Sequence, residues 1–434
     1  MTMTSVSPAA NRSEVRRLIA LFVLAYFAQG LSQAGGLISQ PLNYYLKTGL
    51  GLSATDISEY LAILTIPWMV KPVYGLISDY IPLLGYRRRT WLMLVNLIAA
   101  SGFLWLTGLK DVSTIVVALV LTAFGTAFSD VIIDALVVEN GNRTGQTARF
   151  QGMQWIAFRV AAILTALTGG YLATLFEPAT ALHVAATITM LAPIAVLTMA
   201  YLVVREQPAQ MDIAELRATT RSTLAAIKSP TLQISAAFLA IWCFSPAFGT
   251  PMYYHMVDVL HFDQQFIGQL TALTSVGGLV GAILFTRLLA NKSVTFRATF
   301  AVIAASCVIL TFHLLTQPSS YASQLAPVLN VVSGAIMQIG ALTIFALAAI
   351  ACPPRAEAFT FAALMSLYNG AEQFSAIIGS RLYDQYFDQQ LGPLLWVASG
   401  SFLLCLLMLP LLRRLDKIAD DDDDDDVLFE AAEA

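Results

Sequence analysis

The chain has 434 residues, of which 57% are hydrophobic and only 12% carry a charge, and its formal net charge is −4. An ordinary soluble domain has about 25% charged residues, so this chain cannot cover a folded surface with polar side chains. The composition therefore excludes an ordinary soluble domain and predicts an all-α polytopic membrane protein, with no nucleic-acid partner.

The chain contains runs long enough to cross a membrane. A helix needs about 20 apolar residues to span the hydrocarbon core. Twelve runs meet this length, near residues 17–39, 57–78, 90–109, 113–138, 149–173, 180–203, 231–253, 266–289, 297–316, 326–351, 358–383 and 393–412. We therefore expect twelve transmembrane helices.

The basic residues predict the orientation of these helices. With the N-terminus in the cytoplasm, nineteen of the 24 Lys and Arg residues fall on the cytoplasmic side and only Lys47 and Lys110 on the other. Cytoplasmic loops carry an excess of Lys and Arg, so both termini are predicted to be cytoplasmic. The other three basic residues, Lys71, Arg159 and Arg381, lie inside predicted spans.

Lys71 lies inside the second predicted span, eight residues before Asp79. At helical rise this distance is about 12 Å, so Lys71 is expected deep in the membrane and facing the transport pathway, at a depth similar to Asp134. Pro72 predicts a local kink beside it. A lysine that snorkels to the interface is the alternative.

The loop after the second span reads "GLISDYIPLLGYRRR". Gly75 is expected to allow close helix packing and Gly85 a tight turn. Asp79 is the acid of the segment, and the basic residues expected to meet the lipid headgroups are Arg87, Arg88 and Arg89. The three arginines also suit retention of this loop in the cytoplasm.

The fourth span carries "SDVIIDALVVE", in which Asp130 and Asp134 share one helix face. A charge at the bilayer centre costs about 2.5–3.5 kcal/mol, so such acids usually mark pathways. Two close carboxylates raise the proton affinity of one of them, as a proton-coupled carrier requires. Neutralisation by basic partners is the alternative. Glu139, at the cytoplasmic end, is expected to pair with loop arginines.

Arg159, in the fifth span, is expected at the depth of Asp130 because the two spans are antiparallel. We predict an ion pair with Asp130 or a shared substrate site, and a structural pair stays open. Trp155, one turn earlier, is a candidate to stack on a flat ligand, with core packing as the alternative.

Residues 204–229 interrupt the apolar pattern and divide the chain into predicted bundles at 1–203 and 230–416, followed by a tail at 417–434. The linker suits either a helix on the membrane surface or a flexible tether. Pro41–Ile57 and Pro251–Ile267 share a proline, a tyrosine, a leucine and an isoleucine at an offset of 210 residues. A parallel six-plus-six repeat is typical of transporters with a midplane site.

In the second half, Pro246, Gly249 and Pro251 interrupt the seventh span, and Pro246 is a candidate to line a cavity. Tyr253 suits either stacking on an aromatic ligand or an interfacial belt. The eleventh span carries Glu372, a candidate for substrate or proton, with Asn369 as a substrate-binding candidate; Arg381 is expected to snorkel from the same span.

The acidic residues are concentrated at the end of the chain. Asp420–Asp426 is an unbroken aspartate run, typical of a solvated, disordered tail rather than a calcium loop. The four cysteines lack the spacing of metal ligands and are interpreted as small core residues: Cys243, Cys307, Cys352 and Cys405. No metal or cofactor is expected.

"PWMVKPVYGLISDYIPLLGYRRRTWL" resembles the pattern of the folate–biopterin transporter family within the major facilitator superfamily. "SDVIIDALVVE", "SPAFGTPMYYHMVDVLHFDQQFIG" and "CPPRAEAFTFAALMSLYNG" extend the resemblance over both halves. It implies the major facilitator fold and makes Asp79 part of a cytoplasmic gate. The corresponding loop of the second half reads "GAILFTR" and has no aspartate.

The resemblance implies a secondary transporter in the inner or plasma membrane, working by alternating access as a monomer. We expect a folate- or pterin-like or other anionic organic solute, driven by protons, with sodium left open. A muropeptide, siderophore or drug permease is the alternative, and a non-transporting receptor would need a soluble output domain. The chain has no P-loop, HExxH or GxSxG motif, so neither ATP-driven transport nor an enzyme is expected.

Overall fold

The computed structural model describes residues 12–33, 35–210, 229–350 and 357–412. Within these ranges the regular structure is helical, apart from one isolated bridge between Leu83 and Tyr86. Ten helices in the described ranges are long and apolar enough to cross a membrane. The all-α polytopic fold predicted from composition is therefore confirmed.

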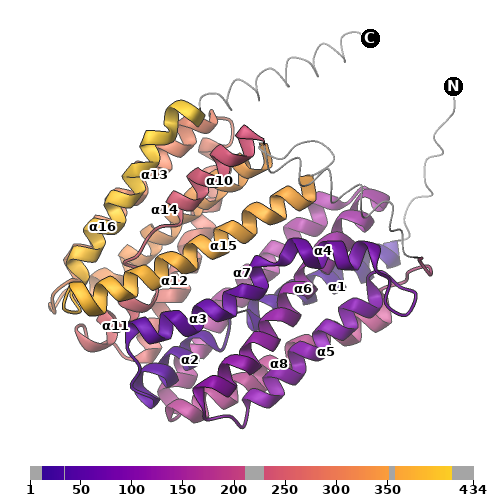
Figure 1. Cartoon of the computed structure of the whole chain (residues 1–434), viewed down its shortest axis with the longest axis horizontal. Coiled ribbons are helices and arrows are strands. Elements are labelled where there is room, and N and C mark those ends of the chain that lie inside the picture. The colour runs from indigo at the N-terminus through magenta and orange to yellow at the C-terminus, as the bar shows by residue number, and fades with distance from the viewer. Residues whose placement is uncertain (1–11, 34, 211–228, 351–356, 413–434) are drawn as a thin grey trace. The chain divides into compact units, whose positions relative to one another are not determined.

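The described residues form two compact units, the first of which contains residues 12–51 and 66–210 (Figure 1). Its elements are α1 (Arg12–Ser32), α2 (Ser39–Tyr44), η1 (Tyr45–Gly49), α4 (Lys71–Tyr80), α5 (Arg89–Leu106), α6 (Val112–Thr144), α7 (Thr147–Leu175) and α8 (Pro178–Val203). Helix α1 packs on α6, α7 and α8, and α5 packs on α6 and α8.

Helix α6 is the most buried of the candidate spans, with 67% of its apolar window inside the protein. Small side chains allow this packing. A Cβ atom on Gly125 would lie 2.4 Å from the carbonyl oxygen of Val95 on α5. Close backbone approach at small residues is the usual way in which membrane helices associate. The helix that carries Asp130 and Asp134 is therefore fixed inside its unit.

The second unit contains residues 52–65 and 229–412. Its elements are the first part of α3 (Ala54–Met69), α10 (Pro230–Trp242), α11 (Thr250–Asp258), α12 (Gln264–Leu284), η2 (Phe285–Leu289), α13 (Val294–Thr311), η3 (Phe312–Leu315), α14 (Ala322–Ile350), α15 (Glu357–Arg381), η4 (Leu382–Tyr386), α16 (Leu391–Leu404) and η5 (Cys405–Met408). Helix α12 packs on α14, α13 packs on α14 and α16, and α10 packs on α15.

Two predicted spans are not among the ten membrane-length apolar helices of the described residues. The seventh is broken into α10 and α11, and Gly249, which directly precedes α11, has a φ of 85°. The predicted interruption at Pro246, Gly249 and Pro251 is confirmed. The eleventh corresponds to α15, which has 25 residues but carries Asn369, Glu372 and other polar groups. Twelve spans and cytoplasmic termini stay predictions.

The second predicted span bends where Pro72 predicts it. Helix α3 ends at Met69 and α4 begins at Lys71, with Val70 between them at φ −98° and ψ 13°. The predicted kink beside Lys71 is confirmed. This bend makes Lys71 the first residue of a new helix.

Several sequence predictions lie outside the described residues: the surface helix in 212–228, Cys352 and the Asp420–Asp426 tail. The bundle boundaries at 203 and 230 also stay predictions. Cys243 and Cys405 are buried thiols, as predicted. Cys307 is exposed, so its interpretation as a core residue is wrong.

Candidate functional site

An ion pair joins the bend after α3 to the buried face of α6. Lys71 Nζ lies 2.5 Å from Asp130 Oδ2, and the two side chains are only 17% and 6% exposed. The same ammonium group lies 4.6 Å from the ring centroid of Trp68. The buried carboxylate and the aromatic face both favour a cation at this position.

Asp134 has a different partner from Asp130. The hydroxyl of Tyr26, on α1, donates a hydrogen bond to Asp134 Oδ1. Tyr26 is buried, whereas the Asp134 side chain is exposed. The two acids therefore differ: Asp130 is buried in an ion pair, and Asp134 is an open carboxylate held by a neutral donor.

These contacts refine the pairings expected from sequence. Lys71 was expected near the depth of Asp134, and its ion pair is with Asp130, one helical turn away. An ion pair between Arg159 and Asp130 stays a prediction. Reasoning from charge missed Tyr26, because a phenol in an apolar helix gives no charge signal.

An exposed aromatic side chain lies beside this cluster. Trp155, on α7, is 50% exposed, and its ring centroid lies 6.3 Å from that of Tyr26. Core packing, the alternative interpretation of Trp155, is therefore wrong. Arg159 follows one turn later and is half-buried. An indole that is half exposed thus lies beside the cluster of Lys71, Asp130, Asp134 and Tyr26.

The predicted gate loop is organised around Arg88, whose side chain is buried. Its guanidinium lies 2.5 Å from Asp79 and 2.8 Å from Glu139, and it donates to Ser78 Oγ at 2.9 Å. Burial lowers the pKa of Arg88, but the carboxylates of Asp79 and Glu139 outweigh it and the pKa is raised. The predicted pairing of Glu139 with a loop arginine is confirmed.

Glu206, which follows α8, holds the end of this loop. Its carboxylate accepts backbone N–H bonds of 3.0, 2.9 and 3.2 Å from Arg87, Arg88 and Arg89. These N–H groups lie at the start of α5, where a helix favours negative charge. Arg87 is exposed, and Arg89 donates to the carbonyl of Tyr201.

The two glycines of the gate loop differ in how far the structure requires a glycine at their positions. Gly85 has a φ of 84°, so the predicted tight turn is confirmed. A Cβ atom on Gly75 would meet nothing closer than Val131, at 3.8 Å. Close helix packing at Gly75 is therefore wrong for this conformation, because the space there would accept a methyl group.

The candidates of the second unit are spread over α11 and α15. Glu372 is exposed and Asn369 is half-buried, both on α15. Tyr253 is buried and its hydroxyl donates to Gln264 Oε1 at 3.1 Å, so its ring has no open face for a ligand in this conformation. Pro246 is buried too. Their roles in binding stay predictions.

The first turns of α3 make a polar contact with the end of α15 within the second unit. Asp384 Oδ2 accepts from the backbone N–H and the hydroxyl of Thr55, at 2.7 and 2.6 Å. Arg381 pairs with Glu59 at 2.6 Å, where snorkelling was expected. Sequence reasoning missed this contact, because its partners lie more than 300 residues apart.

The sequence model of the BT1 family matches residues 29–432, which is nearly the whole chain. The chain belongs to the BT1 family. A folate-biopterin transporter of Synechocystis sp. is 31% identical over 374 residues, which cover 82% of this chain and 73% of that protein. Probable folate-biopterin transporter 4 of Arabidopsis thaliana is 24% identical, with 88% of this chain and 89% of that protein covered.

Solved structures show the same fold. The nucleoside transporter NupG is similar with a TM-score of 0.70 and 12% identity, covering 93% of this chain and 99% of its own. A peptide transporter of the POT family, solved with alafosfalin, has a TM-score of 0.68 and 15% identity, covering 92% and 95%. This BT1 family member is therefore a multi-pass membrane transporter with a major facilitator fold, and not an enzyme.

Proposed function

We propose that this BT1 family member is a secondary active transporter that moves a folate- or pterin-like, or other anionic, organic solute by alternating access, coupled to protons. The observation that carries the proposal is the cluster of Lys71, Asp130, Asp134 and Tyr26 inside apolar helices. Ionisable groups at such positions usually mark a transport pathway. The names of the relatives supply the solute class.

Asp134 is the proposed proton site. Its side chain is exposed, while Asp130 is engaged by Lys71. A proton on Asp134 would remove the charge that otherwise resists movement through a low-dielectric environment. Glu372 is the proposed counterpart in the second unit, where it too is exposed.

The proposed solute contacts follow from the chemical groups of a pterin-like anion, which has a flat ring and a negatively charged tail. A flat pterin ring would stack on Trp155, whose indole is half exposed. An anionic tail would be held by Arg159 and Lys71. In the second unit, the proposed solute contacts are Asn369, Tyr253 and Pro246, the last two in a conformation that exposes them.

The proposed topology has twelve spans in two six-helix bundles, residues 1–203 and 230–416, with both termini in the cytoplasm. Helices α10 and α11 together, and α15, supply the two spans beyond the ten apolar ones. The ion pairs of Arg88 with Asp79 and Glu139 form the proposed cytoplasmic gate. The protein is proposed to work as a monomer in an inner or plasma membrane.

Transport assays with purified protein in liposomes test this function. We expect uptake of radiolabelled folate or pterin when the outside is more acidic than the lumen, and loss of that uptake when a protonophore collapses the gradient. Empty liposomes and an imposed sodium gradient at equal pH are the controls. Failure to bind or accumulate any folate or pterin would overturn the solute class, and the same liposomes would then be screened with muropeptides, siderophores and drugs.

A further inference from the structure

Helix α3 is divided between the two units. Its residues 54–65 belong to the second unit, whereas residues 66–69 and the following helix α4 belong to the first. A bend at Val70 separates the two helices. Among the ten apolar spans of the described residues, the span that they form together is the least buried, with 22% of its apolar window inside the protein. The contacts on either side of the bend therefore decide what holds this span in place.

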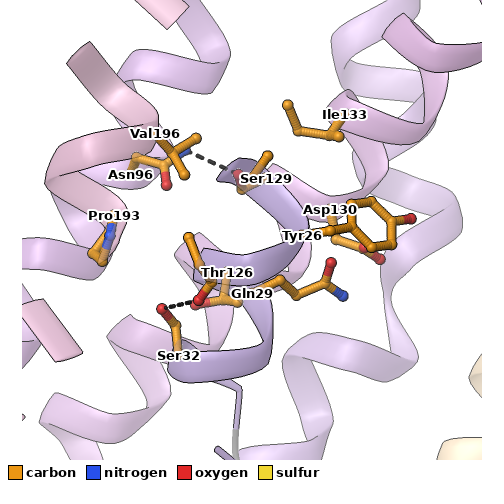
Figure 2. A pocket seen from close by; sticks show the side chains of 12 residues that line it. Tyr26, Gln29, Ser32, Asn96, Thr126, Ser129, Asp130, Ile133, Pro193 and Val196 are labelled. Carbon is orange, nitrogen blue, oxygen red and sulfur yellow. Dashed lines mark hydrogen bonds between the residues drawn. The ribbon is translucent and has the colours of Figure 1, made fainter. Parts of the chain in front are cut away.

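Helix α4 is anchored inside the first unit. Its first residue, Lys71, forms the ion pair with Asp130 of α6. Asp130 lines a small cavity of about 20 Å³, together with Tyr26 and Gln29 of α1 (Figure 2). Residues of α5 and α8 complete the lining, so Asp130 lies among four packed helices. The part of the span that follows the bend is therefore fixed.

The first turns of α3 are bound to α11 and α15 through polar groups. The Ser58 hydroxyl, which is fully buried, donates to Thr250 Oγ1 of α11 at 2.9 Å and lies 2.6 Å from Ser380 Oγ of α15. Gln373 of α15 donates to the carbonyl of Ser58 at 3.2 Å and accepts from the hydroxyl of Thr65 at 3.3 Å. Ser58 is thus the centre of a cluster of buried hydroxyl groups.

Polar bonds of this kind can break and form again. A hydroxyl or amide group that leaves its partner can bond to water instead, so the net cost of separation is small. The Asp384 carboxylate accepts from Thr55 at the start of α3, but its other oxygen, Oδ1, is buried without a hydrogen-bond partner among the described residues. An unsatisfied buried acceptor disfavours the state that buries it. The docked position of α3 is therefore only weakly favoured over a released one.

Other helix contacts in the second unit are closer. A Cβ atom on Gly277 of α12 would lie 2.0 Å from the carbonyl oxygen of Val331 on α14. A Cβ atom on Gly379 of α15 would lie 2.0 Å from the carbonyl oxygen of Pro246, which precedes α11. Such close backbone approach is usual between stably associated membrane helices. Helix α15 and the segment before α11 thus form a fixed surface, and α3 is the element that can leave it.

We propose that residues 54–65 are a latch that releases from α11 and α15 and docks on them again during transport, with the bend at Val70 as its hinge. This inference rests on the proposed function, because a transporter that works by alternating access must separate some of its contacts in each cycle. The hydroxyl cluster of Ser58, Thr250 and Ser380 is the closed contact of the latch. The ion pair of Lys71 with Asp130 stays intact while the latch moves.

A disulfide between the latch and α15 tests the proposal in the transport assay. In a cysteine-free background, Ser58→Cys with Ser380→Cys places two thiols where the hydroxyl oxygens lie 2.6 Å apart. Ser306→Cys with Ser399→Cys is the matched control, because the hydroxyl oxygens of this buried pair on α13 and α16 are also 2.6 Å apart. The disulfide between positions 58 and 380 should abolish uptake, and reduction by dithiothreitol should restore it. The disulfide between positions 306 and 399 should leave uptake unchanged.

Thiol labelling of the purified protein, without any solute, tests the latch independently of the proposed function. Ile57, in the latch, and Ile309, on α13, are both fully buried. Single cysteines are introduced at these positions by Ile57→Cys and Ile309→Cys. A maleimide should label the thiol in the latch within the native protein, because release of the latch exposes it. The thiol on α13 should react only after denaturation.

Equal labelling rates at the two positions would overturn the proposal. So would normal uptake by protein in which mass spectrometry shows the disulfide between positions 58 and 380. Thr55→Cys with Asp384→Cys is the second pair, in case the first disulfide does not form. If Ile57→Cys is labelled as expected but the parent protein carries no folate or pterin, the latch stands and the proposed function fails.

Discussion

Asp130 and Asp134 lie one turn apart on α6, yet their surroundings assign them different tasks. Asp130 is buried, paired with Lys71 and next to the small cavity. Asp134 is exposed and held by the hydroxyl of Tyr26. Their place inside an apolar span and their spacing of four residues indicated both acids in the sequence. Which acid takes which partner depends on the bend at Val70 and on α1, and neither contact follows from spacing.

The variant Asp134→Asn should abolish proton-driven uptake while the protein stays folded. An amide cannot bind the proton, but its oxygen can still accept the bond from Tyr26. We expect uptake driven by a pH gradient to fall by at least about 100-fold, the scale on which general acid–base groups act. Solute exchange without a gradient should persist. Uptake with normal pH dependence would show that Asp134 is not the proton site.

The variant Tyr26→Phe tests the same site with a smaller chemical change. It removes only the donor to Asp134 and should leave a weaker, shifted pH dependence of uptake. A loss of stability without any change in the pH profile would instead indicate a purely structural role for Tyr26.

The Lys71–Asp130 ion pair predicts a strong energetic coupling between the two residues. Lys71→Met leaves a buried carboxylate unpaired, which usually costs about 3–5 kcal/mol. Lys71→Met combined with Asp130→Asn removes both charges and should recover most of this loss. Thermal or denaturant unfolding of the four proteins in a double-mutant cycle measures the coupling. Additive effects would mean that the ion pair does not form.

At the scale of elements, the sequence predicted the breaks within helices, but it did not predict the contacts between distant segments. Pro72 predicted the bend between α3 and α4, and Pro246 with Gly249 predicted the break between α10 and α11, because both residues act on their own backbone. The contacts of Glu206 with Arg88 and of Asp384 with Thr55 join segments far apart in the chain. No periodicity in the sequence marks such pairs.

Glu206→Gln should loosen the start of α5 and the gate loop. The carboxylate accepts three backbone N–H bonds there, in the position of a helix cap. Loss of such a cap costs about 0.5–2 kcal/mol. Hydrogen–deuterium exchange should become faster at residues 86–91. Glu177→Gln is the matched control, because Glu177 precedes α8 without a side-chain capping bond. Equal protection in both variants would contradict the capping role.

At the scale of the whole molecule, composition and charge predicted a polytopic helical membrane protein, and the family resemblance implied a transporter. The family and the fold support both conclusions. The number of spans was harder to predict. Helices α10 and α11 are short, and α15 is polar, because a transporter places broken helices and polar groups along its pathway. The hydropathy signal for a membrane span is therefore weakest in the helices that are expected to line the transport pathway.

Cysteine accessibility in a cysteine-free background tests the twelve-span topology. Single cysteines are placed at exposed positions by Arg87→Cys, Lys110→Cys, Gln265→Cys and Lys292→Cys. A membrane-impermeant maleimide on intact cells should label the cysteines at Lys110 and Gln265. The cysteines at Arg87 and Lys292 should react only after permeabilisation. If α10 and α11 together do not cross the membrane, the labels at Gln265 and Lys292 exchange sides while the other two stay unchanged. That outcome would replace the parallel repeat of two six-helix bundles with an odd number of spans.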